Sequence, residues 1–175
     1  AHLSQLAITL SKRELISVPK FVSATLYLIK HLADQPIRRQ EIIHLAATAK
    51  ERANDIQDSS VQTDLLSMRS YVASAVGESG DVGRALEEYR QLLSTFELLL
   101  DKNNPLILNA RSQIAHWLGE SGDGLNALKE CLALLPDQER VLGDRHPQTL
   151  TTRNNIAWWL GQSGDIDGAL EKYKA

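Results

Sequence analysis

The chain has 175 residues, of which 43% are hydrophobic and 23% are charged, and its formal net charge is −3. This length and composition are typical of a folded domain with a hydrophobic core of its own. Lysine and arginine are scattered along the chain, and no apolar run reaches the roughly 20 residues of a membrane-spanning helix, so the sequence argues against charge-driven nucleic-acid binding and against membrane insertion.

Residues 1–61 lack the Ser-Gly-Asp phrase that marks the rest of the chain. The spacing of their apolar residues predicts helices over about 20–34 and about 38–56, and a further helix over 2–16, with Pro19 opening the next helix. We interpret this segment as a degenerate helical repeat or an N-terminal cap.

One short phrase then occurs three times, at intervals of 42 residues. It is Gly-Glu-Ser-Gly-Asp at 77–81 and at 119–123, and Gly-Gln-Ser-Gly-Asp at 161–165. Neighbouring residues keep the same register in three columns, which are Leu66, Leu108 and Leu150; Arg69, Arg111 and Arg153; and Ala85, Ala127 and Ala169. A fixed period of this size indicates a stacked repeat, in which each unit covers the apolar face of its neighbour.

The period divides residues 62–175 into three repeats, 62–103, 104–145 and 146–175. The third repeat is truncated, so we expect the chain to be a fragment of a longer protein. Each repeat is expected to form two antiparallel helices. The sequence therefore predicts an all-α solenoid of helix pairs.

The first helix of each repeat has a recognisable start and an apolar face. In the second repeat Asn104 caps a helix that Pro105 opens and that runs over about 105–119, and the third repeat has a matching helix over about 147–161 after His146. The residues expected on the apolar faces are Leu66, Val72, Ala73 and Val76; Leu108, Ile114, Ala115 and Leu118; and Leu150, Ile156, Ala157 and Leu160.

The recurring phrase is expected to turn the chain from the first helix into the second. We expect its first glycine to take a positive φ at the end of the first helix. We expect its aspartate to cap the second helix by accepting a backbone hydrogen bond. The glycines are Gly77, Gly119 and Gly161, and the aspartates are Asp81, Asp123 and Asp165.

The second helices carry an apolar stripe of their own. Its members are Ala85, Leu86, Tyr89, Leu92, Leu93 and Phe96 in the first repeat, and Ala127, Leu128, Cys131, Leu132 and Leu135 in the second. In the second repeat we expect Pro136 to kink the helix and Gly143 to end it. Cys131 is the single cysteine, and its place in the stripe indicates a buried thiol in a reducing, cytoplasmic compartment.

The phrase Leu-Gly-Gln-Ser-Gly-Asp at 160–165, with Ala-Leu and Tyr four and eight residues past the aspartate, resembles the tetratricopeptide repeat. The 42-residue period and the stretches at 142–147 and 152–157 are similar to the variety found in kinesin light chains and in the sensor regions of bacterial and fungal STAND-type signalling ATPases. The resemblance covers about 61–175 well and 20–60 loosely. It implies a right-handed superhelix whose first helices line a concave groove that binds peptides or proteins.

The resemblance places one polar side of each first helix in that groove. In the second and third repeats this side carries Asn109, Ser112, Gln113, His116, Thr151, Asn154, Asn155 and Trp158. In the first repeat it carries Ser67, Ser70, Tyr71, Ser74 and Glu78. Amide side chains hydrogen-bond to a peptide backbone whatever its sequence, and Asn155 matches an asparagine that the family often uses in this way. The alternative is that these are solvated helix positions without a ligand.

The three tryptophans divide into two kinds. Trp117 and Trp159 stand in register and are expected to pack between repeats. Trp158 aligns with Ser74 and His116, which are both polar, so we expect it to be exposed. An exposed tryptophan indicates a contact surface, which makes Trp158 the strongest single candidate for ligand binding.

The arginine column has two interpretations. As a ladder along the solenoid, Arg69, Arg111 and Arg153 would bind carboxylate or phosphate groups of a ligand. The alternative, which we favour, is that they bond carboxylates or helix-end carbonyls of neighbouring helices, because a structural role also explains why the arginine recurs. The lysine-rich clamp with which some members of the family bind C-terminal carboxylates is not evident.

No set of residues has the arrangement that catalysis requires. The five histidines lack the spacing of zinc ligands, and the glycine-rich phrase lacks the lysine and the strand of a phosphate-binding loop. We therefore expect no enzymatic activity, no metal and no cofactor.

The sequence predicts a non-enzymatic module that binds a protein or peptide, as a scaffold or sensor arm of a larger protein. Self-association through an open end of the solenoid, at Ala169, Leu170 and Tyr173, is the alternative. A spacer without any ligand is a third interpretation.

Overall fold

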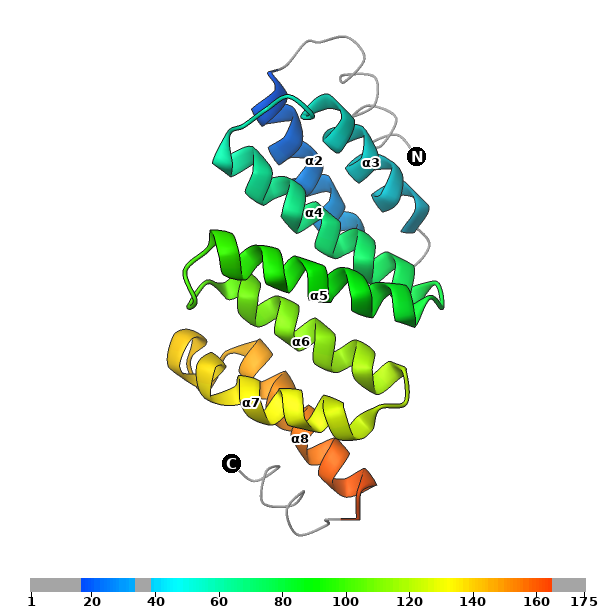
Figure 1. Ribbon diagram of the computed structural model, residues 1–175, viewed down its shortest axis with the longest axis vertical. Helices are drawn as coiled ribbons and strands as arrows, with labels where there is room; N and C mark the ends of the chain where they lie inside the picture. Colours follow the sequence, from blue (N-terminus) through cyan, green and yellow to red (C-terminus); the bar gives the residue numbers. More distant parts are fainter. Residues whose placement is uncertain (1–16, 34–38, 165–175) are drawn as a thin grey trace. The chain divides into compact units, whose positions relative to one another are not determined.

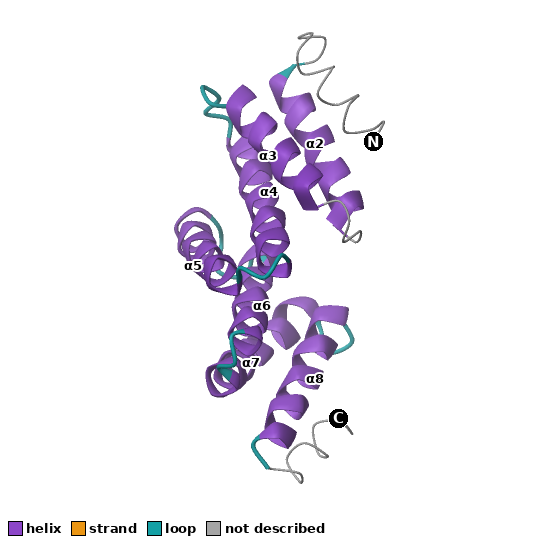
Figure 2. Ribbon diagram, turned by 90° about the vertical axis from the view of Figure 1, so that its right-hand side faces the viewer, coloured by secondary structure: helices purple, strands orange, loops and turns teal. Residues whose placement is uncertain are grey.

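The computed structural model describes residues 17–33 and 39–164. Within these ranges it contains helices and no strands (Figure 2). The helices are α2 (Val18–Ala33), α3 (Arg39–Arg52), α4 (Ser59–Glu78), α5 (Val82–Leu99), α6 (Pro105–Glu120), α7 (Gly124–Leu142) and α8 (Pro147–Gln162). Two of them correspond to the helices predicted over 20–34 and 38–56, although α3 ends earlier than expected. The helix predicted over 2–16 lies outside the described residues.

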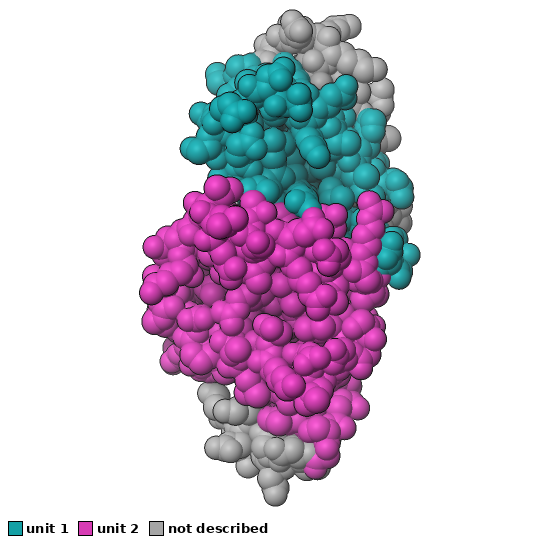
Figure 3. Space-filling model, in the orientation of Figure 1, with its two compact units in different colours: residues 1–81 teal, residues 82–175 magenta. Residues whose placement is uncertain are grey.

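The chain divides into two compact units, residues 1–81 and 82–175 (Figure 3). The boundary falls between α4 and α5, which are the two helices of the first repeat in the sequence. The sequence period and the compact units therefore divide the chain differently, and the division into 42-residue repeats remains our proposal.

The first unit is a bundle in which α2, α3 and α4 each pack against the other two. Its core consists of buried apolar side chains at helical spacing, among them Phe21, Val22, Ile29, Leu45 and Met68. Asp58 begins α4, where its carboxylate accepts hydrogen bonds from the backbone N–H groups of Ser60 and Val61 at 2.9 and 3.1 Å. The Ser60 hydroxyl also donates to this carboxylate, and this bond is the main reason why the pKa of Asp58 is lowered.

The second unit stacks α5, α6, α7 and α8 in chain order, each packed antiparallel against the next (Figure 1). The predicted stripe of α5 is buried at Ala85, Leu86, Tyr89, Leu92 and Phe96. Cys131 and Trp117 are also buried, as expected.

The prediction that two leucines of the second unit are buried is wrong. Leu132 and Leu150 are 46% and 44% exposed. Each lies one residue past the buried stripe of its helix, because Cys131 and Leu134 face the core in α7 and Thr149 faces it in α8. One residue along a helix is a rotation of about 100°, which is enough to turn a side chain out of the core.

The turn formed by the recurring phrase differs from our prediction. Gly119 stays helical within α6, and the second glycine of the phrase, Gly122, takes the positive φ of 86°. The Gly122 N–H donates to the Gly119 carbonyl and the Asp123 N–H to the Leu118 carbonyl, both at 2.9 Å. This pair of bonds is the Schellman motif, which needs a left-handed residue directly after the C-cap.

The other two copies turn in the same way. The helices continue through Gly77 and Gly161, and Gly80 and Gly164 take positive φ values of 105° and 89°. The expectation that Gly77, Gly119 and Gly161 take a positive φ is therefore wrong in each copy.

The predicted caps of the second unit are confirmed. Asn104 caps α6 by accepting from the Leu106 N–H at 2.9 Å, and Asp123 caps α7 by accepting from the Asn126 N–H at 3.3 Å. The helix α7 continues through Pro136 as one element and ends at Gly143, whose φ is 94°. Asp165, the third predicted cap, lies outside the described residues.

Candidate functional site

The predicted site residues of α6 lie along one side of that helix. Asn109, Ser112, Gln113 and His116 follow the i, i+3, i+4, i+7 spacing of neighbours on a helix surface. His116 is exposed and the other three are half-buried. The His116 ring meets the edge of buried Trp117 at a centroid distance of 4.6 Å. Ser112 is already engaged, because its hydroxyl accepts a hydrogen bond from Nε2 of Gln138 at 3.0 Å.

The matching residues of α8 have the same helical spacing, and the large side chain of Trp158 takes the place of His116. Trp158 is 56% exposed, as expected for a contact residue. Thr151 and Asn154 are exposed and Asn155 is half-buried. The Thr151 hydroxyl donates to the Pro147 carbonyl of its own helix at 2.9 Å, so it is not free to bind a ligand without breaking that bond.

Four side-chain amides on these two helices remain unengaged. Among the described residues, nothing hydrogen-bonds to the amides of Asn109, Gln113, Asn154 and Asn155. Each amide offers two donors and an acceptor. The polar sides of α6 and α8 therefore carry unused hydrogen-bonding capacity together with one exposed indole.

A close contact at Trp159 ties α8 to the end of α6. The Trp159 ring lies so near Gly119 and Gly124 that a Cβ built on either would come within 2.5 and 2.9 Å of it. Gly119 is three residues after His116, so this contact holds the helix that carries Trp158 against the C-terminal end of the helix that carries His116. No hydrogen bond or ring contact joins the described site residues of α6 to those of α8.

The arginine column bonds to carboxylates of α7 in the second unit. Nη1 of Arg111 lies 2.8 Å from Oδ2 of Asp137, and Nη2 of Arg153 lies 2.8 Å from Oε1 of Glu139. Arg153 also lies 3.8 Å from an oxygen of Asp144. These pairs support the structural interpretation of the column. In the first unit, Arg69 lines a cavity between α3 and α4.

Asp137 is the centre of one of these clusters, because Arg111 and Arg140 both donate to it, at 2.8 and 2.9 Å. The pKa of Asp137 is held below its ordinary value of 3.8, first by the hydrogen bond from Arg140 and then by that from Arg111. A carboxyl with a lowered folded-state pKa stabilises the fold above its unfolded-state pKa, and this stabilisation is lost as the pH falls through the folded-state value.

Replacing Asp137 with asparagine is therefore expected to lower the free energy of unfolding by about 1 kcal/mol at pH 7. Urea unfolding of both proteins over a pH series measures the difference, which should shrink as the pH falls below 3.8. Asp144→Asn is the matched control and should cost less, because Asp144 is more exposed and lies farther from Arg153. A difference that persists unchanged in acid would contradict the assignment.

Sequence reasoning missed Gln138, which is 0% exposed. It stands in the column that holds buried Phe96 one repeat earlier, and its Oε1 has no hydrogen-bond partner. A polar glutamine does not by itself predict a buried position, whereas the apolar Phe96 at the aligned position does. The buried Gln138 amide on α7 donates a hydrogen bond to the Ser112 hydroxyl and so fixes the position of that hydroxyl on the polar side of α6.

Reactive groups are not assembled in the described part of the chain. No three histidine, cysteine, aspartate or glutamate side chains are grouped there so that they could hold a metal ion. Burial raises the pKa of the Cys131 thiol to about 11, so the thiol stays protonated at neutral pH. None of the described helices has both the length and the apolarity to cross a membrane.

Comparison with known families places the repeat in the C-terminal part of the chain. Residues 106–175 match the tetratricopeptide repeat family. This stretch of the chain therefore resembles a tetratricopeptide repeat array. The resemblance predicted from the recurring phrase is therefore confirmed, and a tetratricopeptide repeat array implies a scaffold for protein–protein interaction. No curated protein sequence matches the chain.

Solved structures extend the tetratricopeptide-like fold over nearly the whole chain. BtubC (BKLC) from P. vanneervenii is similar at 18% identity with a TM-score of 0.79, over 98% of this chain and 68% of that one. Nearly identical TPR-like repeats of a putative kinesin light chain from Podosopora anserina give 18% identity and a TM-score of 0.55, over 98% and 90%. The apo form of RapI gives 15% and 0.74, over 95% and 58%. At these identities the likeness establishes the fold alone, and it confirms the predicted all-α fold of helix pairs.

Proposed function

We propose that the chain is a non-enzymatic module that binds a protein or peptide along the polar sides of α6 and α8. In a longer protein it acts as a scaffold or sensor arm in the cytoplasm. The observation that carries the proposal is the set of four unengaged amides, Asn109, Gln113, Asn154 and Asn155, together with the exposed indole of Trp158 on α8.

The chemistry of this set suits a peptide. Amides at helical spacing donate to backbone carbonyls and accept from backbone N–H groups, so they hold an extended chain without selecting its sequence. Trp158 supplies a large apolar contact at a low entropic cost, and buried tryptophans are frequent binding hot spots. The half-buried position of Asn155 favours it over Asn154 as the amide that a ligand would cover.

Replacing Trp158 and Asn155 together with alanine is expected to weaken peptide binding at least about tenfold. The probes are peptides selected by phage display against the wild-type chain, and their dissociation constants are measured by fluorescence anisotropy. Circular dichroism should show unchanged helicity, because neither side chain is in the core.

Tyr27→Ala is the matched control for this experiment. Tyr27 is also an exposed aromatic residue on a helix, but it lies on α2. Selected peptides that bind the double variant as tightly as the wild-type chain would place the site elsewhere. A selection that yields no binding peptide would favour the spacer interpretation.

Self-association remains the alternative function. The residues predicted to mediate it, Ala169, Leu170 and Tyr173, lie outside the described residues. A mass that rises with concentration in light scattering, and that Leu170→Glu abolishes, would support it over peptide binding.

A further inference from the structure

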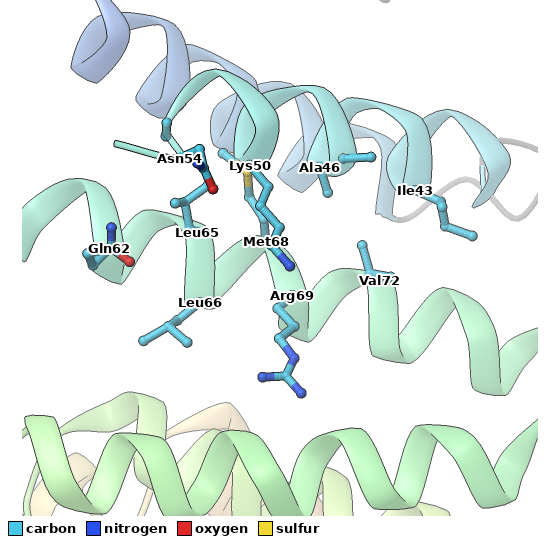
Figure 4. Close-up of a pocket in the computed structure, with 12 residues that line it drawn as sticks. Ile43, Ala46, Lys50, Asn54, Gln62, Leu65, Leu66, Met68, Arg69 and Val72 are labelled. Atoms are coloured by element: carbon cyan, nitrogen blue, oxygen red, sulfur yellow. The ribbon is translucent and has the colours of Figure 1, made fainter. Parts of the chain in front are cut away.

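An apolar groove in the first unit lies outside the face assigned to peptide binding. It is a cavity of about 470 Å³ between α3 and α4, within the size range of binding sites (Figure 4). Its lining consists of Ile43, Ala46, Ala47, Lys50, Ala53, Asn54, Gln62, Leu65, Leu66, Met68, Arg69 and Val72. None of the eight residues of the predicted α6–α8 site contributes to it.

The lining follows one stripe along each of the two helices. On α3 the stripe runs from Ile43 to Lys50 and continues past the helix end to Asn54, and on α4 it runs from Gln62 to Val72, in steps of three and four residues. With a rise of 1.5 Å per residue, each stripe is roughly 15 Å long. A groove of this length between two helices has room for about three turns of a third helix.

The groove is apolar along its length and cationic in the middle. Leucine, isoleucine and valine side chains supply the apolar surface, and two alanines on α3, Ala46 and Ala47, leave space for a helix backbone to approach closely. Lys50 extends from α3 toward α4, and Arg69 projects from α4 (Figure 4). The lining contains no carboxylate and Lys50 is exposed, so charge complementarity favours a ligand with an acidic group beside Lys50.

We propose that this groove binds an amphipathic helix of a partner protein, with leucine-type side chains at i, i+3, i+4 and i+7 and an acidic residue beside them that pairs with Lys50. A helix fits better than an extended strand, because no sheet edge borders the groove. It fits better than a nucleobase, because the lining has no aromatic ring on which a base could stack.

The test uses two blocked synthetic peptides of about 14 residues, a length at which a helix is marginally stable in water. Both carry leucine at i, i+3, i+4 and i+7 and alanine elsewhere, and they differ at two flanking positions, which are glutamate in one and lysine in the other. Fluorescence anisotropy with the 175-residue chain is expected to show that the glutamate peptide binds at least tenfold more tightly.

Lys50→Glu is expected to reverse this preference, so that the lysine peptide becomes the tighter ligand. The matched control is Lys30→Glu, because Lys30 is also an exposed lysine of the first unit but does not line the groove. Both substitutions are at exposed helix positions, so neither is expected to disturb folding. Ala47→Glu, which adds a bulky charged side chain to the lining, should weaken binding of both peptides.

Several results would overturn the proposal. One is the same peptide preference in Lys50→Glu as in Lys30→Glu. Another is that neither peptide binds at millimolar concentration. Loss of peptide binding in Trp158→Ala would move the ligand to the α6–α8 site. A chain that doubles its mass in light scattering, and becomes monomeric in Ala47→Glu, would show that a second copy covers the groove instead.

Discussion

Replacing Gly119 with alanine is expected to destabilise the second unit by about 1–3 kcal/mol, the cost of overpacking a filled site. This loss of stability is the opposite of what helix propensity predicts, because alanine inside a helix is normally about 1 kcal/mol more favourable than glycine. Here the new Cβ would lie 2.5 Å from Cζ2 and 3.2 Å from Cη2 of Trp159. Urea unfolding followed by circular dichroism measures the change.

The indole has little room to move away from a methyl group at Gly119. A Cβ on Gly124 would lie only 2.9 Å from Cε3 and from Cζ3 of the same ring, so Trp159 is held between two glycines. Indole rings are rigid, and displacing this one would pull α8 from its contact with the turn between α6 and α7. We therefore expect the penalty to exceed the gain in helix propensity.

Gly83→Ala is the matched control, since Gly83 is also a helical glycine of the second unit but its Cβ would meet nothing within 4 Å. This substitution should stabilise the chain by up to about 1 kcal/mol. In a Trp159→Ala background, Gly119→Ala should also become stabilising, because the clash is gone. If Gly119→Ala stabilises the wild-type chain as Gly83→Ala does, the contact with Trp159 does not exist.

The features that depend on neighbouring residues in the chain could be predicted from the sequence. Asn104 before Pro105 is a cap whose hydrogen bond closes within two residues, and Asp123 caps α7 in a similar way. Gly143 ends α7 as expected. The 42-residue period predicted the helix pairs, because a repeated local pattern repeats its local structure.

The features that depend on packing could not be predicted in the same way. The recurring phrase contains two glycines, and helix rules alone did not decide which of them is left-handed. Gly119 is needed because Trp159 of the next repeat crosses it, and that contact joins residues 40 positions apart. Leu150 and Leu132 are one helical step from the core, which a pattern of apolar residues does not resolve.

The candidate site also combines local features that the sequence predicts with packing contacts that it does not. Helical spacing predicted which residues share the polar side of α6, and the exposure of Trp158 followed from its alignment with two polar residues. The bond from Gln138 to Ser112 and the pairing of Arg111 with Asp137 both reach across to α7. The sequence does not specify such contacts until the helices are placed.

Replacing Phe96 with alanine is expected to lower the free energy of unfolding of the second unit by about 3–5 kcal/mol, the largest stability effect that we expect. Phe96 is 1% exposed on α5 and continues the buried stripe of Tyr89 and Leu92. Removing the ring forfeits its burial and leaves a cavity that the packed helices fill only partly. Thermal unfolding in a calorimeter measures the loss.

Leu98→Ala in the same helix is the control, because it also truncates a large apolar side chain but one that is not buried. Leu98 is 84% exposed, and its truncation should change stability by less than about 0.5 kcal/mol. Because the second unit stacks its helices in sequence, loss of Phe96 should also lower the unfolding temperature of α6, which packs directly against α5. Equal effects from Phe96→Ala and Leu98→Ala would mean that α5 does not bury this stripe, and would remove the packing on which the placement of α6, and with it His116 and Asn109, depends.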